Sequence, residues 1–503
     1  MRSFLKASVA TAFMLTTQVA MANKSDDTVY VGFTKEVETL DSYFTSLREG
    51  IVLQRAIWDG LIHRNPVTGE YKGNLATDWN WVDDVTLELN LREGVKFHNG
   101  EEFDADDVVY TVNFIVNPEN GVKTQRNVNW MKNAVKIDKY KVRINLKEPF
   151  PAAIEFLSGP IAIYPNEYYK EVGPKGMGIK PVGTGPYAVT SVDVGKHFVL
   201  TKNRAYHNSP KGMPAIANLD IKTIPEMNTQ IAELFNGKLD FIWQVHADQA
   251  QKLDKMGKFT VANESTMRIG YISMDAAGRT GKDNPFTDVR VRQAVGHAID
   301  RETMVKALLR GESKVVNSAC FPTQFGCEIN VAKYEYNPEK AKQLLAEAGY
   351  PDGFSTEFYS YRNRDYAEAM ANYLNAVGIE VNFKTLKYAA LLDKRKQQGV
   401  PMSFLTWGSY SINDVSAITS QFFKHGSLDD TRDDEVKAWL DIADASTDSE
   451  TRMKNYSLAL NKIADEAYWI PLFSYNTNYV FSKEVDYTPT SDEIVRFTDM
   501  KWK

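Results

Sequence analysis

The sequence predicts a protein of the α/β class that is built from two or three domains. Stretches in which apolar and polar residues alternate, a pattern typical of β-strands, recur along the chain. Stretches with one apolar face at helical spacing lie between them, and this alternation of strands with helices favours the α/β class. The 503-residue chain is also too long for a single hydrophobic core, since such cores stop growing at about 250–300 residues.

The predicted elements follow one another in mixed order. Alternation predicts strands at residues 28–33, 86–91, 140–146, 198–201, 219–223, 239–243, 379–383 and from 469. Amphipathic spacing predicts helices at residues 103–110, 228–235, 289–299, 337–348, 366–377 and 434–460. Pro338 suits the first turn of its helix, and Gly349 and Gly378 end two others.

The first 22 residues have the pattern of a secretory signal peptide. Arg2 and Lys6 give a basic start, an uncharged run follows, and Ala20-Met21-Ala22 forms an A-x-A cleavage site. We expect cleavage after Ala22 and a location outside the cytoplasm; the alternative is a buried N-terminal helix. The uncharged run is shorter than the roughly 20 residues that span a membrane, and no later apolar stretch is long enough, so we expect no membrane insertion.

The charge balance bears on the partners. The formal net charge is −6, and it becomes −8 when Arg2 and Lys6 are removed with the signal peptide. An acidic chain argues against nucleic acid or an anionic membrane as the main partner. It does not distinguish a cationic ligand from a zwitterionic one.

The two cysteines, Cys320 and Cys327, lie close together in a loop rich in Pro, Gly and Phe. In an oxidising compartment such a pair is expected to form a disulfide, which would stiffen the loop locally with little effect on global stability. The alternatives are free thiols or half of a metal site. The seven histidines show no metal-binding spacing, so we expect no metal and no cofactor.

Four ordered segments carry a resemblance to a known family. They are residues 91–110 (LREGVKFHNG followed by FDADDVVY), 181–187 (PVGTGPY), 289–301 (VRVRQAVGHAIDR) and 337–354 (NPEKAKQLLAEAG leading into GYPDGF). Through them the chain resembles, over its whole mature length, the extracellular solute-binding proteins that serve dipeptide, oligopeptide, glutathione and nickel ABC importers.

The resemblance implies a two-lobed periplasmic binding protein with an additional inserted domain and a ligand cleft between the lobes. Lobe I would combine residues 23–65, 186–269 and 480–503, the inserted domain would span 66–185, and lobe II would span 270–479. The implied partners are a small-molecule ligand, a short peptide or a peptide-like molecule, and the transmembrane subunits of an ABC importer. A periplasmic monomer is expected.

Capture of a zwitterionic peptide requires a cation for its carboxylate and an anion for its amine. Peptide-binding relatives carry an arginine at the start of the helix that precedes a Gly-Ile turn, here Gly378-Ile379. That position falls on Arg364, with Arg362 as its neighbour, and the resemblance implies a carboxylate-binding role there. The alternative for Arg364 is a solvent-facing arginine at a helix start.

The relatives also carry an aspartate shortly after a Trp-Gly strand end. The matching segment, residues 405–416, keeps Trp407 and should line the cleft together with Ser409 and Tyr410. The acid position itself holds Tyr410 or Ser411, and the first acid is Asp414. Either Asp414 replaces the missing acid from a shifted loop, or the ligand has no free amine there.

Three further positions are candidates because each follows a predicted strand. Trp243 and His246 come after one strand end, where Trp243 could line the cleft or pack at a hinge. Glu36, with Glu38 nearby, lies in the loop after the first strand and could offer a carboxylate to an amine; a solvated loop is the alternative.

Two other functions are weighed against peptide capture. A non-peptide ligand such as an opine, glutathione, a modified sugar or a nickel chelate is the alternative within the family. A periplasmic hydrolase is the alternative outside it, but the sequence has no G-x-S-x-G, H-E-x-x-H or Walker A motif. We therefore expect a binding protein and not an enzyme.

Overall fold

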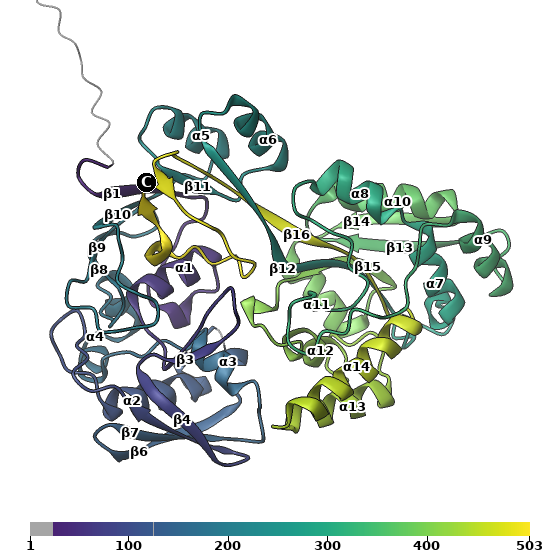
Figure 1. The fold of residues 1–503 in the computed structure, drawn as a ribbon. Coiled ribbons are helices and arrows are strands. Elements are labelled where there is room, and N and C mark those ends of the chain that lie inside the picture. The colour runs from purple at the N-terminus through teal and green to yellow at the C-terminus, as the bar shows by residue number, and fades with distance from the viewer. Residues whose placement is uncertain (1–23, 124) are drawn as a thin grey trace, which may run out of the picture.

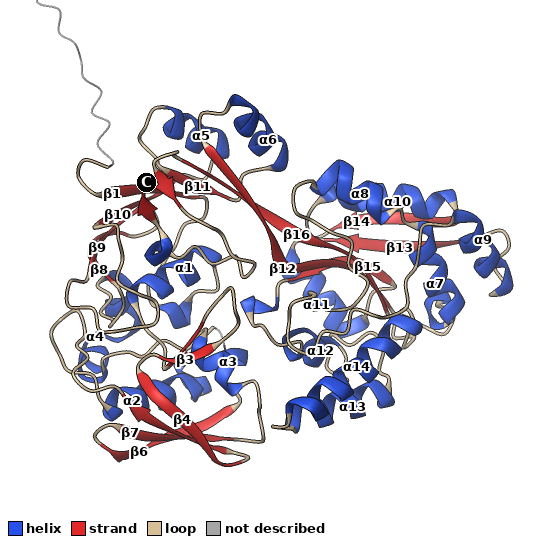
Figure 2. Cartoon of the chain, in the orientation of Figure 1, coloured by secondary structure: helices blue, strands red, loops and turns tan. Residues whose placement is uncertain are grey.

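The computed structural model describes residues 24–123 and 125–503. The expected signal peptide and its cleavage point after Ala22 lie outside the described residues. Figure 1 shows two lobes joined by a pair of long strands, and Figure 2 shows helices on both sides of the strands in the second lobe. The α/β class and the two-lobed architecture are confirmed.

One ten-stranded sheet runs through both lobes in the order β14-β13-β15-β12-β16-β11-β1-β10-β9-β8. Lobe I contributes β1 (Thr28–Phe33), β8 (Tyr187–Asp193), β9 (His197–Lys202), β10 (Asn218–Thr223) and β11 (Phe241–Trp243). Lobe II contributes β13 (Phe354–Ser360), β14 (Ile379–Thr385) and β15 (Met402–Trp407). Parallel pairs such as β1 with β10 and β13 with β14 occur together with antiparallel pairs such as β12 with β15.

The chain crosses between the lobes in β12 (Thr260–Met274) and returns in β16 (Trp469–Phe481). The two strands are antiparallel partners from Thr260 opposite Phe481 to Ser273 opposite Trp469, with a register shift between Ser265 and Ile269. We call this pair the hinge strands. Because the register shift lies within the crossing, the pairing is interrupted where the lobes meet.

A separate four-stranded sheet, in the order β4-β5-β7-β6, lies within the part of the chain expected to form the inserted domain. Its strands are β4 (Ala76–Asp83), β5 (Thr86–Leu91), β6 (Met131–Asp138) and β7 (Lys141–Leu146), and its main helix is α2 (Ala105–Val116). Asp104 and Asp107 form a capping box at the start of α2, which explains why the acidic run there begins a helix. The division of the chain into five segments stays a proposal.

The remaining elements surround these sheets. Two small sheets pair β2 (Ile62–Arg64) with β3 (Tyr71–Gly73) and β17 (Val485–Asp486) with β18 (Lys501–Trp502). Helices before the hinge are α1 (Arg48–Ile57), α3 (Ala153–Ser158), α4 (Asn166–Ile179), α5 (Met227–Phe235) and α6 (Ala247–Met256). Helices of lobe II are α7 (Val289–Ala298), α8 (Arg301–Met304), α9 (Pro338–Glu347), α10 (Arg364–Ala376), α11 (Tyr388–Gln398), α12 (Ser416–Phe422), α13 (Asp434–Ala445) and α14 (Ser449–Asp465).

The structure corrects the sequence prediction at three elements. The helix predicted at 434–460 is two helices, because Asp448 caps a new helix and accepts a hydrogen bond from the Thr451 amide. The strand that begins at Trp469 continues to Phe481, far beyond the predicted segment. Strand β12 was not predicted.

A buried polar cluster in lobe I centres on Asp59, whose side chain is fully buried. Its carboxylate pairs with Lys211 Nζ at 2.7 Å and with His207 Nε2 at 2.9 Å. The Tyr206 hydroxyl also donates to it at 3.0 Å, and Asn74 Nδ2 at 3.1 Å. Burial alone would raise the pKa of Asp59, but the Lys211 ammonium and the His207 hydrogen bond hold that pKa well below its usual range. Asp59 is therefore a buried anion that organises one end of lobe I.

Candidate functional site

A strained loop follows strand β15 in lobe II. Ser409, Tyr410 and Ser411 form a 3-10 turn in which all three residues have positive φ, of 48°, 51° and 63°. Residues other than glycine rarely adopt this left-handed conformation, which costs on the order of 1–3 kcal/mol each. Such strain persists only where the surroundings hold it, and it is concentrated at functional sites.

Contacts across the lobes hold one side of this loop. Arg48 Nη1, at the start of α1, donates to Ser411 Oγ at 2.6 Å, and Ser411 Oγ donates in turn to the Asp492 carbonyl oxygen at 2.6 Å. The Asn413 amide donates to Glu155 Oε1 at 2.7 Å. Arg48 and Asp492 lie in the segments expected to form lobe I, and Glu155 lies in the expected inserted domain, so the loop from Gly408 to Val415 is one place where lobe II contacts the rest of the molecule.

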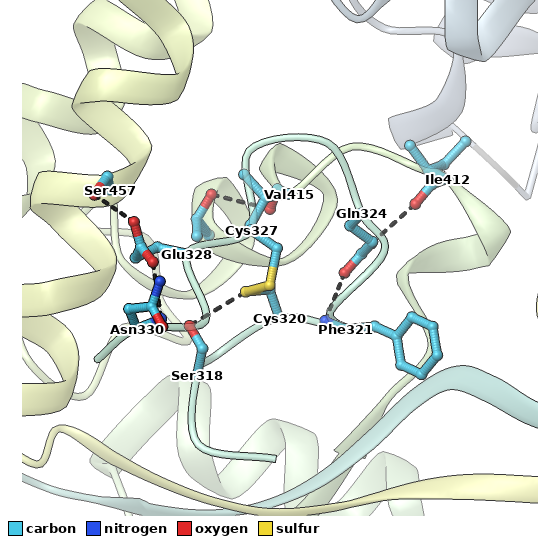
Figure 3. The surroundings of a disulfide bond; sticks show 11 residues. Ser318, Cys320, Phe321, Gln324, Cys327, Glu328, Asn330, Ile412, Val415 and Ser457 are labelled. Atoms are coloured by element: carbon cyan, nitrogen blue, oxygen red, sulfur yellow. Dashed lines mark hydrogen bonds between the residues drawn. A yellow bond between two sulfur atoms is a disulfide. The ribbon is translucent and has the colours of Figure 1, made fainter. Parts of the chain in front are cut away.

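A disulfide-closed segment holds the other side. Cys320 and Cys327 form a disulfide in the structure, and Figure 3 shows the loop that they close. The Phe325 amide donates to the Asn413 carbonyl at 3.1 Å, and the Val415 amide donates to the Phe325 carbonyl at 3.0 Å. Gln324 Nε2 donates to the Ile412 carbonyl at 3.0 Å (Figure 3). The disulfide therefore braces the loop that contacts lobe I.

We expect the Cys320→Ser, Cys327→Ser double variant to loosen this loop while leaving global unfolding nearly unchanged. The closed segment is short, so we expect the disulfide to stabilise the ordered conformation of this segment by about 2–3 kcal/mol. Hydrogen–deuterium exchange should become faster in residues 409–415 and 320–327. Exchange in the β4–β7 sheet serves as the internal control, and equal acceleration in both regions would contradict a local bracing role.

Three arginines meet around one carboxylate where the hinge strands pass between the lobes. Glu493 Oε2 lies 3.0 Å from Arg48 Nη2 and 3.7 Å from Arg268 Nη2. Arg268 comes from β12, and its guanidinium lies so close to Gly408 that a Cβ there would be 2.9 Å from Nη2. Thr406 Oγ1 accepts from Arg268 Nη1 at 3.5 Å and from Arg362 Nη1 at 3.4 Å. We call Arg48, Arg268, Arg362, Thr406 and Glu493 the hinge cluster.

Aromatic side chains surround the exposed arginine of the cluster. The Arg362 guanidinium lies 5.4 Å from the centre of the Tyr475 ring and 6.0 Å from that of Tyr361. The Tyr361 hydroxyl is 2.8 Å from Thr406 Oγ1. Arg362 is nevertheless exposed, so its guanidinium is open to a ligand.

The charges of the hinge cluster do not cancel. Burial alone would raise the pKa of Glu493, but the Arg268 and Arg48 guanidinium groups hold that pKa below its usual range, so the carboxylate is ionised. Three guanidinium groups then face a single carboxylate. This excess of positive charge suits a ligand carboxylate, because arginine pairs with carboxylates through two parallel hydrogen bonds.

A cavity of about 250 Å³ lies beside the hinge cluster. Tyr410, Ser411 and Ile412 of lobe II line one side of it, and residues of lobe I and of the expected inserted domain line the remainder. This second wall includes part of α1, residues 62–67, residues 158–160, Asp492 and residues 494–499. The strained loop therefore faces the cavity on one side and the disulfide segment on the other.

Two of the predicted ligand residues lie away from this site. Arg364 points outward with a side chain that is 70% exposed, and it pairs with Glu368 at 2.7 Å one turn along α10. Asp414 is buried and pairs with Arg452 at 2.8 Å, and it also accepts from the Ser416 amide and hydroxyl. Of the two predicted arginines, Arg362 therefore belongs to the hinge cluster and Arg364 does not, and Asp414 is paired inside lobe II.

The other predicted residues divide between the loop and the rest of lobe I. Trp407 is almost buried, donates to the Ala417 carbonyl at 2.9 Å and packs edge-on against Tyr410, so it supports the loop from beneath. Ser409 is buried in the loop, and Tyr410 is partly exposed beside the cavity. Trp243 is 1% exposed and stacks on Tyr479, which is core packing. His246 and Glu36 are exposed and lie outside the hinge cluster.

Within the described residues, no cluster of His, Cys, Asp and Glu has the arrangement of a metal site. Across the same part of the chain, no helix combines the length and apolar character needed to cross a membrane.

Comparison with known proteins explains this architecture. A sequence model of the bacterial extracellular solute-binding proteins, family 5, matches residues 70–429. The chain belongs to this family. Family 5 proteins are extracellular binding proteins that capture a solute for an ABC importer, and this family 5 protein has the two-lobed fold of its solved structural neighbours.

Curated relatives of this family 5 protein include the glutathione-binding proteins GsiB. The Escherichia coli K12 protein is 29% identical over 484 residues, which cover 92% of this chain and 91% of the relative. The Salmonella typhimurium protein is 28% identical over 464 residues, or 88% of each chain.

Solved structures share the fold. HbpA2 from Haemophilus parasuis matches with a TM-score of 0.83 and 23% identity, covering 95% of this chain and all of that one. A dipeptide-binding protein from Pseudoalteromonas sp. SM9913, in complex with Met-Leu, matches with a TM-score of 0.77 and 23% identity over the same shares. NikA from Brucella suis, in complex with Fe(III)-EDTA, matches with a TM-score of 0.81 and 24% identity over 95% of this chain and all of that one.

Proposed function

We propose that this family 5 protein captures a short peptide or peptide-like ligand that carries a carboxylate, and delivers it from the periplasm to the transmembrane subunits of an ABC importer. The observation that carries the proposal is the hinge cluster, in which Arg48 and Arg268 pair with Glu493 and Arg362 shares Thr406 with Arg268. Closure of the lobes around a ligand would stabilise the form that the importer recognises.

The carboxylate and the amine of the proposed ligand each have a partner in the hinge cluster. Arg362 is the proposed receptor for the carboxylate, with Thr406 and the tyrosine rings fixing its guanidinium. Glu493 is the proposed partner of the ligand amine, in place of the acid that is missing at Tyr410 and Ser411. Glu493 suits this role because the surrounding arginines keep it ionised.

A thermal-shift panel tests the proposed ligand class. Reduced glutathione, Met-Leu, mannopinic acid and Fe(III)-EDTA represent a tripeptide, a dipeptide, an opine and a metal chelate. A ligand present at about 100 times its Kd should stabilise the protein by about 2.7 kcal/mol. We expect glutathione or Met-Leu to raise the melting temperature and to be recovered unchanged, since no catalysis is proposed. Stabilisation by Fe(III)-EDTA alone would refute the peptide proposal, and consumption of a ligand would refute binding without catalysis.

The proposal has three further parts. The chain is proposed to be exported, cut after Ala22 and active as a monomer. Mass spectrometry of the secreted protein would give the mature N-terminus, and size-exclusion chromatography with light scattering would give the oligomeric state. A mature N-terminus other than Asn23, or a stable dimer, would refute the corresponding part.

A further inference from the structure

Two arginines of helix α1 lie on the same face of the helix. Arg48 and Arg55 are separated by seven residues, and Ile51 lies between them at the i+3 position. Residues at this spacing share one helix face, and the rise of 1.5 Å per residue places the two arginines about 10 Å apart along the axis. Arg48 belongs to the hinge cluster, while Ile51 and Arg55 line the cavity. One face of α1 therefore leads from the hinge cluster into the cavity.

Arg55 is a cation without a carboxylate partner among the described residues. Its Nη1 donates to the Ser158 carbonyl at 2.9 Å, and its Nε is buried with no hydrogen-bond partner. The other strong cations of the cavity wall are already paired: Arg64 with Glu155 at 3.0 Å, Lys211 with Asp59, and Arg496 with Asp492. A buried charge without a partner is costly, so this arrangement suits an anion that arrives from outside the chain.

The surroundings of Arg55 keep the cavity suited to an anion. Burial, reinforced by the Lys211 ammonium, lowers the pKa of the neighbouring His63 to about 3, so this imidazole is neutral. Burial and the nearby Arg496 lower the pKa of Arg55 to about 10, which leaves it charged at neutral pH. Asn127, which is 7% exposed, lines the same cavity with an Oδ1 atom that has no hydrogen-bond partner among the residues that the structure describes. This acceptor suits an amide N–H of the same ligand.

We propose that the cavity beside Arg55 is a second anion subsite, which binds the far carboxylate of a peptide-like ligand whose first carboxylate lies at the hinge cluster. This inference rests on the proposed function and narrows it to an extended ligand with a carboxylate at each end. Glutathione has this form, since its γ-glutamyl end carries an amine and a carboxylate and its glycine end carries a second carboxylate. A dipeptide such as Met-Leu has only one carboxylate and would leave the Arg55 subsite empty.

Isothermal titration calorimetry with two matched probes tests the subsite. The probes are reduced glutathione and the same tripeptide with its glycine carboxylate converted to a carboxamide. The wild-type protein should bind the acid roughly 10- to 100-fold more tightly than the amide. This ratio of affinities corresponds to the typical free energy of one hydrogen bond to a charged group. The Arg55→Gln variant should bind the acid about as weakly as the amide, and its affinity for the amide should equal that of the wild type.

The matched control is Arg143→Gln, which removes an exposed arginine that pairs with Glu88 in the β4–β7 sheet. It should preserve the preference for the acid. If Arg55→Gln does not fold, Arg55→Lys replaces it as the test variant. Lysine keeps the charge but lacks the planar guanidinium, so Arg55→Lys should show a smaller preference for the acid over the amide than the wild type does.

The outcomes separate the two proposals. Equal binding of both probes by the wild type and by Arg55→Gln would remove the second subsite while leaving peptide capture in place. Binding of Met-Leu without binding of glutathione would also remove the second subsite while leaving peptide capture in place. Binding of none of the three probes would overturn peptide capture and the subsite together.

Discussion

Replacement of Arg362 by alanine is expected to weaken binding of a carboxylate ligand by about 2–5 kcal/mol, because ligand binding would bury the guanidinium against the carboxylate and Tyr475. The loss should appear mainly in the dissociation rate, since truncating a buried charge pair affects release more than encounter. Titration calorimetry and stopped-flow dissociation of whichever peptide stabilises the protein would measure both quantities.

The chain offers a matched control two residues away. Arg364→Ala removes the same side chain from an exposed position where it pairs only with Glu368. Exposed pairs of this kind contribute about 0.2–1 kcal/mol to stability, and no effect on affinity is expected. A loss of affinity in Arg364→Ala without one in Arg362→Ala would reverse the assignment and restore the position that the family resemblance indicated.

Replacement of Asp59 by alanine is expected to destabilise the protein by about 3–5 kcal/mol in urea unfolding. The change would leave Lys211 buried without its anion and would remove an acceptor from His207, Tyr206 and Asn74. Asp193→Ala is the control, because its pair with Lys196 is exposed and should contribute less than about 1 kcal/mol. Equal losses in the two variants would contradict a structural role for the Asp59 cluster.

The Asp59 effect should depend on pH with a definite sign. The pKa of Asp59 is lower in the folded protein than in the unfolded chain, so its contribution is complete above the unfolded pKa of about 3.9 and is lost as pH falls further. The difference between wild type and Asp59→Ala should therefore be constant from about pH 5 to 7 and shrink below about pH 4. Adding Lys211→Met should restore part of the loss, since it removes the orphaned buried charge.

The local patterns of the sequence predicted only part of the secondary structure. The strand at Thr28–Phe33 has the predicted bounds, and the helices at 289–299 and 337–348 differ by one or two residues. Strand β12 of the hinge escaped prediction for a physical reason. The second half of β12 is buried on both faces and so lacks the alternation that reveals a half-buried strand, while its first half carries polar residues.

The hinge cluster could not be predicted because its members are distant in the sequence. Arg48 and Glu493 are 445 residues apart, and nothing near either residue signals the other. The family resemblance indicated Arg364, Arg362 and the loop after Trp407, and of these Arg362 belongs to the hinge cluster and the loop lies beside it. Arg364 lies outside the cluster, because a helix start fixes the position of a backbone but not the direction of each side chain.

The separation of Arg48 from Glu493 in the sequence also affects when the candidate binding site can form during folding. Strand β1 pairs with β11, and β11 pairs with β16, so the first lobe is complete only when the last part of the chain has joined it. Lobe II can fold from consecutive residues, whereas lobe I also needs its closing strand β16. Contacts of such high sequence separation form slowly. We therefore expect the hinge cluster, which joins Arg48 to Glu493, to form late in folding.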